Sequence, residues 1–277
     1  YENARCGKGG IIFVTGETGV GKSRLLKEFK VFTQLKQSHC FTGYAYKDKT
    51  NPLESFYDIF RELVNHIKEG AELSQSRELR ISLAVLFKMF PDLSNGHRLK
   101  NLPHLKTLEP NQEKLRNFEA LYELVQYLAS DLGGIVILLE DLHWADELSL
   151  QFLEYLGYNL SDRNIFICGT YRKEALEENL LLRRMVANLK NEGYLNLVEL
   201  RPFNIESLYS FLDSTITPGS NSAELVQYLM QKTGGNPFFV EEIIRTLLRT
   251  RIVNIGEKMA IEHFQRISIP ETIQDVI

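Results

Sequence analysis

The sequence predicts an α/β protein in which helices cover both faces of a parallel sheet, followed by a small helical part. Short β-branched apolar runs alternate with stretches of helical apolar periodicity, which is typical of parallel sheets with crossover helices. A glycine-rich segment joins the first run to the first helix, and the strand signals stop after Arg201 and Pro202. With 277 residues, 44% of them hydrophobic, the chain can form one large and one smaller domain.

The first predicted strand runs from Ile11 to Val14, between Gly10 and Gly16, as expected of a short buried parallel strand. From Lys22 onward, apolar residues recur at helical spacing. Further strands are expected at 40–46, 135–139, 165–169 and 195–200, and helices at 53–67, 78–90, 111–129, 148–160, 205–212, 223–231 and 238–249. The helices between the second and third strands form an insertion.

A segment between the first strand and the first helix matches the phosphate-binding pattern G-x-x-x-x-G-K-[ST]: Gly16, Glu17, Thr18, Gly19, Val20, Gly21, Lys22 and Ser23. A loop that wraps a polyphosphate aims backbone N–H groups inward, and glycine tolerates the backbone angles that this requires. Lys22 would bring its charge to the β- and γ-phosphates, and Ser23 would offer its hydroxyl to Mg²⁺. The alternative is a glycine-rich turn with an incidental Lys-Ser pair. We predict that these eight residues bind ATP or ADP with Mg²⁺ and that Lys22 also acts in catalysis.

The predicted strand at 135–139 is followed by two carboxylates, Glu140 and Asp141. Mg²⁺ prefers oxygen ligands, and a P-loop protein needs a carboxylate at the end of a strand near the loop. We assign Glu140 to Mg²⁺, through water, and Asp141 to orienting or deprotonating the attacking water, although which of them binds the metal stays open. Asp146 is another candidate base, but its position before a predicted helix favours an N-cap role.

Charge and cysteine content bear on the class of protein. A net charge of −4 and a pI near 6.0 give no global basic field of the kind that non-specific nucleic-acid binding requires. The cysteines Cys6, Cys40 and Cys168 are widely spaced, as expected of reduced thiols in a cytoplasmic protein. No apolar stretch approaches the ~20 residues of a membrane helix. The chain does not begin with Met and is interpreted as a fragment of a longer protein.

Four segments, taken in order, resemble the AAA-type ATPase module of the STAND class: residues 16–23, 138–146, 169–172 and 234–242. The similarity is to the "predicted ATPase" branch found in multidomain transcription regulators, kinase fusions and soluble adenylyl cyclases. It implies an ASCE-type P-loop NTPase sheet with the phosphate-loop strand next to the acidic strand. The implied domains are a nucleotide-binding α/β domain at 1–201, a helical lid at 202–250, and a linker with the start of a winged-helix-like domain, from Pro270 on, at 251–277.

The resemblance also implies roles for residues outside the loop. Thr170 would be a polar sensor at the end of its strand, and Arg172 would reach the γ-phosphate. Pro237 would pack on the adenine, with Asn236 beside it. Local physics offers alternatives, in which Arg172 pairs with Glu174 at the surface, and Asn236 and Pro237 cap and begin a helix after a pair of glycines.

The function expected from these features is a regulatory switch in which ADP holds the lid on the core, ATP exchange rearranges them, and slow hydrolysis resets the state. The expected partners are the nucleotide, other domains of the same longer signalling chain and a nucleotide-dependent homo-oligomer, with no membrane or nucleic acid. The alternative is an AAA-type hydrolytic motor or loader acting on DNA, which would need an arginine finger that the sequence does not identify. A small-molecule kinase and a scaffold with an inactive loop are further alternatives. A GTPase is not expected, because the chain lacks an Asn-Lys-x-Asp segment.

Overall fold

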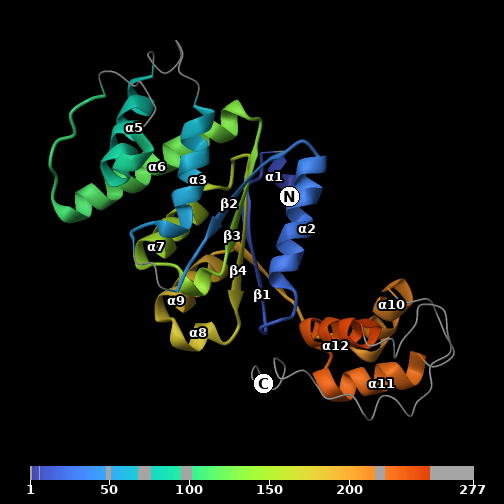
Figure 1. Cartoon of the computed structure of the whole chain (residues 1–277). Helices are drawn as coiled ribbons and strands as arrows, with labels where there is room; N and C mark the ends of the chain where they lie inside the picture. The colour runs from blue at the N-terminus through green and yellow to red at the C-terminus, as the bar shows by residue number, and fades with distance from the viewer. Residues whose placement is uncertain are drawn as a thin grey trace. The chain divides into compact units, whose positions relative to one another are not determined.

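The computed structural model describes residues 2–5, 7–47, 51–67, 76–94, 102–215 and 222–249, whose helices and strands are drawn in Figure 1. The chain divides into two compact units. Unit 1 comprises residues 1–15 and 23–198, and unit 2 comprises residues 16–22 and 199–277. Cys6 and the expected start of a winged-helix-like domain at Pro270 lie outside the described residues. The domain boundaries expected at 201 and 250 stay predictions.

Five strands form one sheet in the order β2-β3-β4-β1-β5. They are β1 (Gly10–Gly16), β2 (His39–Tyr44), β3 (Ile135–Glu140), β4 (Ile165–Arg172) and β5 (Leu195–Glu199). β3 pairs in parallel with both β2 and β4, and Ile137 lies opposite Phe41 on one side and Ile167 on the other. Because β3 is buried on both faces, its sequence is a continuous apolar run with no alternation. The predicted α/β fold with a parallel sheet is confirmed.

The position of β4 corrects one expectation. The resemblance implied that the phosphate-loop strand β1 lies next to the acidic strand β3, but β4 lies between them. The chain leaves β3, passes through α7 (Glu147–Asn159) and returns as β4 beside β3. Strands joined by one crossover helix commonly become neighbours, so β4 takes the place that β1 was expected to occupy. The carboxyl end of β4, with Thr170, therefore lies beside the carboxyl end of β3.

The helices before β5 are α1 (Glu2–Arg5), α2 (Lys22–Leu35), α3 (Glu54–His66), α5 (Arg77–Met89), α6 (Pro110–Asp131), α7, α8 (Ala175–Glu178) and α9 (Leu180–Asn191), with 3-10 turns η1 (Pro91–Ser94) and η2 (Leu142–Trp144). The sequence interpretation missed α8 and α9. α9 does bury Leu182, Met185 and Leu189 at helical spacing. The exposed Leu180 and Leu181 at its start obscure that pattern, because they make the segment apolar on several faces.

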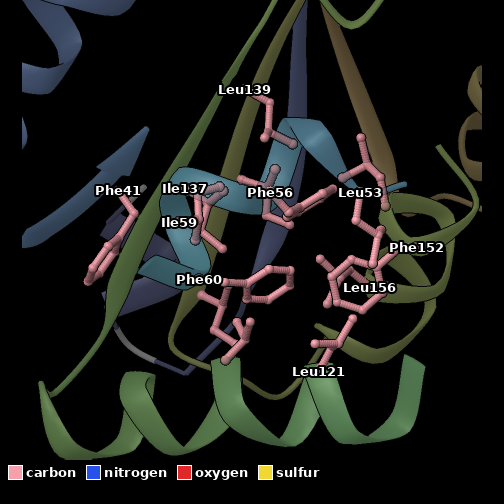
Figure 2. Packing of buried hydrophobic residues seen from close by; sticks show 14 of the residues in the cluster. Phe41, Leu53, Phe56, Ile59, Phe60, Leu121, Ile137, Leu139, Phe152 and Leu156 are labelled. Carbon is pink, nitrogen blue, oxygen red and sulfur yellow. The ribbon is translucent and has the colours of Figure 1, made fainter. Parts of the chain in front are cut away.

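One apolar core holds the sheet and the helical insertion of unit 1 together. Figure 2 shows Phe56 and Phe60 of α3 and Phe152 of α7 pointing toward one another, with Ile137 of β3 and Leu121 of α6 nearby. All five side chains are fully buried. The rings of Phe56 and Phe152 meet edge to face, with centroids 5.0 Å apart. The insertion therefore packs onto the sheet and shares its core.

Unit 2 has a small core of its own, formed by α10 (Ile205–Thr215), α11 (Ser222–Thr233) and α12 (Pro237–Arg249). Leu208, Leu229 and Val240, one from each helix, are completely buried in it. The three helices predicted after the last strand are thus present. In the described ranges, none of the helices has the length and apolar character that crossing a membrane requires.

Candidate nucleotide-binding site

The loop between β1 and α2 turns at three glycines with positive φ angles, Gly16 (150°), Gly19 (82°) and Gly21 (105°). Residues with a side chain rarely adopt such angles. A Cβ at Gly21 would meet no described atom within 4 Å, so the backbone angle alone requires glycine there. Val20 is buried, and its N–H lies 3.4 Å from the Glu17 carbonyl oxygen across the turn.

Lys22, the first residue of α2, folds its side chain back over the loop. Its ammonium donates hydrogen bonds to the carbonyl oxygens of Gly16 and Glu17, both at 2.7 Å. Lys22 is only 8% exposed. The oxygens of a bound anion such as phosphate could replace these two carbonyl oxygens as acceptors for the Lys22 ammonium.

The loop is also bonded to the turn that precedes α12. The Asn236 side-chain amide donates to the Thr18 carbonyl oxygen at 2.9 Å, and the Phe238 N–H donates to the Gly19 carbonyl oxygen at 3.2 Å. These residues all belong to unit 2. Asn236 is buried. From the sequence, Asn236 was expected beside a nucleotide contact or as a helix cap, and nothing local in the sequence indicates its bond to Thr18.

The turn at 234–238 has the local structure that its sequence predicts. Gly234 and Gly235 have φ angles of 58° and 80° after α11 ends. Asn236 accepts the Phe238 N–H on Oδ1 at 3.1 Å, and Pro237 is the first residue of α12. The capping roles of Asn236 and Pro237 are confirmed, whereas the adenine contact of Pro237 stays a prediction.

In unit 1, the side chain of Ser23 lies against the carboxylate at the end of β3. The Ser23 hydroxyl is close enough to act on the Glu140 carboxylate as a hydrogen-bonding partner that lowers its pKa. Burial raises the pKa of Glu140 above its usual value, a shift that the bond from Ser23 reduces and the neighbouring Asp141 increases. A partly buried carboxylate of this kind is stabilised in its ionised form by a nearby cation.

Asp141 has an unusual backbone conformation that a neighbouring strand supports. Its φ of 60° is in the left-handed region, which residues other than glycine seldom adopt. Its N–H donates to the hydroxyl of Thr170 at the end of β4, at 3.0 Å, and Thr170 is completely buried. The Asp141 side chain remains 43% exposed, with its Oδ1 3.9 Å from Nδ1 of His143. The carboxylate is thus fixed at its backbone and open at its tip.

Asp146 is an N-cap, as its position predicted. Its Oδ1 accepts the N–H of Ser149 at 3.0 Å, at the start of α7. The same oxygen accepts the N–H of Leu53 at 3.1 Å. Leu53 is fully buried with a φ of 58°, so Asp146 also anchors the strained residue that precedes α3.

The predicted site residues fall into two groups. In unit 2 the loop 16–22 contacts the turn 234–238, and in unit 1 Ser23, Glu140, Asp141 and Thr170 form a connected set. The structure does not bring Arg172 into either group. It is exposed at the end of β4, and among the residues that the structure describes it makes no ion pair with Glu174. The surface ion pair is therefore not found in the described part of the chain, and the contact of Arg172 with the γ-phosphate stays a prediction.

The donor groups fit a nucleotide with Mg²⁺. In the part of the chain that is described, no cluster of three or more His, Cys, Asp or Glu side chains could enclose a metal ion. Mg²⁺ seldom needs such a cluster, since it keeps several waters and binds one or two protein oxygens together with phosphates. The Ser23 hydroxyl and the Glu140 carboxylate are oxygens of the kind that could take this part, and a glycine loop with the Lys22 ammonium suits phosphates.

Comparisons with known proteins agree with this geometry. The family described as "AAA ATPase domain" matches residues 1–168, and a second family, "Domain of unknown function (DUF8739)", matches residues 219–260. An uncharacterized protein of Rhizobium meliloti (strain 1021) is 25% identical over 175 residues. That alignment covers 55% of this chain and only 15% of the relative, which is a much longer protein.

Proposed function

The chain belongs to the family of AAA ATPase domains, and we propose that it is a switch module that binds ATP or ADP with Mg²⁺ and hydrolyses ATP slowly. Such a switch would have an ADP state and an ATP state that differ in how the C-terminal helices engage the nucleotide. This is the arrangement that the STAND class would imply. Nucleotide binding itself follows from the family.

The observation that carries the proposal is the adjacency of two sets of groups along the chain. Lys22 stands at the end of the glycine loop, and two carbonyl oxygens of the loop accept hydrogen bonds from its ammonium. The next residue, Ser23, interacts with the carboxylate of Glu140. One peptide bond therefore joins the groups suited to phosphate to those suited to Mg²⁺. An incidental glycine-rich turn would not need this combination.

Each residue has one task in this proposal. On phosphate binding, Lys22 exchanges the carbonyl oxygens of Gly16 and Glu17 for phosphate oxygens. Mg²⁺, when bound, would neutralise charge on the phosphates, held by Ser23 and, through water, by Glu140. Asp141 orients or deprotonates the attacking water, which its exposed carboxylate can reach.

Three further residues are proposed to sense the nucleotide. Thr170 holds the N–H of Asp141, so a shift of the β4 end would move the carboxylate that handles the water. Arg172 would reach the γ-phosphate, and Pro237 would pack on the adenine. Arg172 would distinguish ATP from ADP, because only ATP offers the γ-phosphate, whereas Pro237 would contact the adenine that both nucleotides share.

We also propose that the module works inside a longer cytoplasmic signalling protein. The Rhizobium meliloti relative supports this, because the matched part is 15% of its length. The proposed partners are the other domains of that chain and, with nucleotide bound, further copies of the same protein. No role in nucleic-acid binding is proposed, given the net charge of −4.

The test is to measure the nucleotide content and the ATP turnover of the purified domain. Tightly bound ADP and turnover below about one per minute are the results expected of a switch. Turnover near the ~10 s⁻¹ of typical enzymes would exclude a switch, and stimulation by DNA would favour a motor instead. Lys22→Ala should abolish nucleotide retention, whereas Lys190→Ala, which removes an exposed lysine of α9, should leave it unchanged. Retention by the Lys22 variant would refute the loop assignment.

A further inference from the structure

The first four carbonyl groups of the phosphate loop accept hydrogen bonds from two sources, the Lys22 side chain and the turn at 234–238. Lys22 donates to the oxygens of Gly16 and Glu17, and the turn at 234–238 donates to the oxygens of Thr18 and Gly19. The donors from the turn are the Asn236 amide and the Phe238 N–H. All these residues lie in unit 2. The backbone acceptors of this stretch are therefore accounted for, half of them by residues more than two hundred positions away.

The bonds from the turn also orient the loop's N–H groups. A trans peptide is planar, and its C=O and N–H point in opposite directions. Fixing the Thr18 oxygen toward Asn236 therefore aims the Gly19 N–H away from the turn, and fixing the Gly19 oxygen does the same for the Val20 N–H. The Val20 N–H indeed points to the Glu17 oxygen, which also accepts from Lys22. At 3.4 Å this is a weak bond that an incoming phosphate oxygen could replace.

The contact between the loop and the turn is close as well as polar. A Cβ built at Gly19 would lie 2.8 Å from Oδ1 of Asn236 and 3.0 Å from Cβ of Phe238. Asn236 is buried, and its side chain is held at both ends, since Oδ1 accepts from Phe238 while Nδ2 donates to Thr18. The side chain thus has one well-defined position against the loop.

We propose that Asn236 is a positioning residue for the phosphate loop. Its Nδ2 holds the Thr18 carbonyl, and its Oδ1 holds the Phe238 N–H that bonds the Gly19 carbonyl, so that the Gly19 and Val20 N–H groups are aimed at the nucleotide phosphates. This inference rests on the proposed nucleotide binding and adds a route of regulation. Phosphates that bind these N–H groups favour the bonded turn, and the bonded turn favours phosphate binding, because coupling between two sites is reciprocal. The C-terminal helices would then respond to the nucleotide through the peptide planes of the loop.

The decisive variant is Asn236→Asp, which keeps the helix cap but replaces the Nδ2 donor by an oxygen facing the Thr18 oxygen. Asn204→Asp is the matched control, because Asn204 caps α10 by accepting the Ser207 N–H at 2.7 Å, and among the described residues its hydrogen bonds do not go to the loop. We expect Asn236→Asp to weaken Mg·ADP binding about tenfold in calorimetric titration, and Asn204→Asp to change it less than twofold. Should Asn236→Asp not fold, Asn236→Ser removes the amide donor without adding a charge.

Hydrogen exchange separates this proposal from the proposed function. In nucleotide-free protein, the amides of Gly19 and Val20 should exchange faster in Asn236→Asp than in Asn204→Asp, since the loop is no longer held. With Mg·ADP, the amides of residues 234–238 should gain protection in the wild type and gain less in Asn236→Asp. Equal loop exchange and equal ADP affinity in the two variants would overturn the role of Asn236. If the wild type binds no nucleotide, the proposed function fails, and the exchange of the nucleotide-free loop still decides whether Asn236 orients it.

Discussion

Replacing Gly19 by alanine tests whether the loop conformation in this structure is the one that binds phosphate. Gly19 has a φ of 82°, which costs an alanine about 1–2 kcal/mol. If the alanine loop relaxes to a negative φ without nucleotide and must return to the original angle to bind, this cost alone weakens Mg·ADP binding by roughly 5- to 30-fold. The new methyl group would also lie 2.8 Å from Oδ1 of Asn236, which must then move. We therefore expect a loss of at least about tenfold.

Gly193→Ala is a close control for this measurement. Gly193 follows α9 with a φ of 81°, but a Cβ there meets no described atom within 4 Å. Its alanine variant carries the same backbone cost, about 1–2 kcal/mol of stability, without crowding the loop. Calorimetric titration with Mg·ADP should find wild-type affinity for Gly193→Ala and a marked loss for Gly19→Ala. Equal affinities in the two variants would show that the binding loop does not have the conformation described here.

Two further predictions concern unit 1. Asp146→Ala leaves the N–H groups of Ser149 and Leu53 without their acceptor and should lower the free energy of unfolding by about 2–4 kcal/mol. Ser76→Ala, which removes a cap that accepts one backbone N–H, that of Leu79, and donates at the surface to Glu78, should cost about 1 kcal/mol. Urea unfolding, followed by the fluorescence of the single Trp, compares the free energies of unfolding of the two variants. If Asp146→Ala instead lost ATP turnover with unchanged stability, Asp146 would be a catalytic base. Burial raises the pKa of Cys168 to about 12, so at pH 8 only about one thiol in ten thousand is ionised. Iodoacetamide should leave Cys168 unmodified in folded protein, with labelling that rises as the pH is raised toward 12, and labelling at the rate of unfolded protein would contradict its burial in β4.

Several parts of the site could be predicted because their signals are local. The phosphate loop is local in the sequence, since its glycines follow the apolar run of β1 directly and are followed directly by the helix that begins at Lys22. Asp146 likewise directly precedes the helix that it caps. A positive φ angle, an N-cap and a strand buried on both faces each favour particular residue types at or next to that position, so they can be recognised from a short segment. The helix α9 was missed although its spacing was present, because two exposed leucines masked its apolar face.

Other parts depended on contacts between distant segments. The place of β4 between β1 and β3 depends on how the crossovers pack on the sheet, and no residue in β4 indicates which strands it will pair with. The bond from Asn236 to Thr18 joins residues 218 positions apart. A capping asparagine has the same local sequence whether its amide faces water or a loop carbonyl. The amino-acid sequence by itself thus determined which segments form the phosphate loop, the acidic strand end and the helix caps, whereas only tertiary packing decided what these groups face.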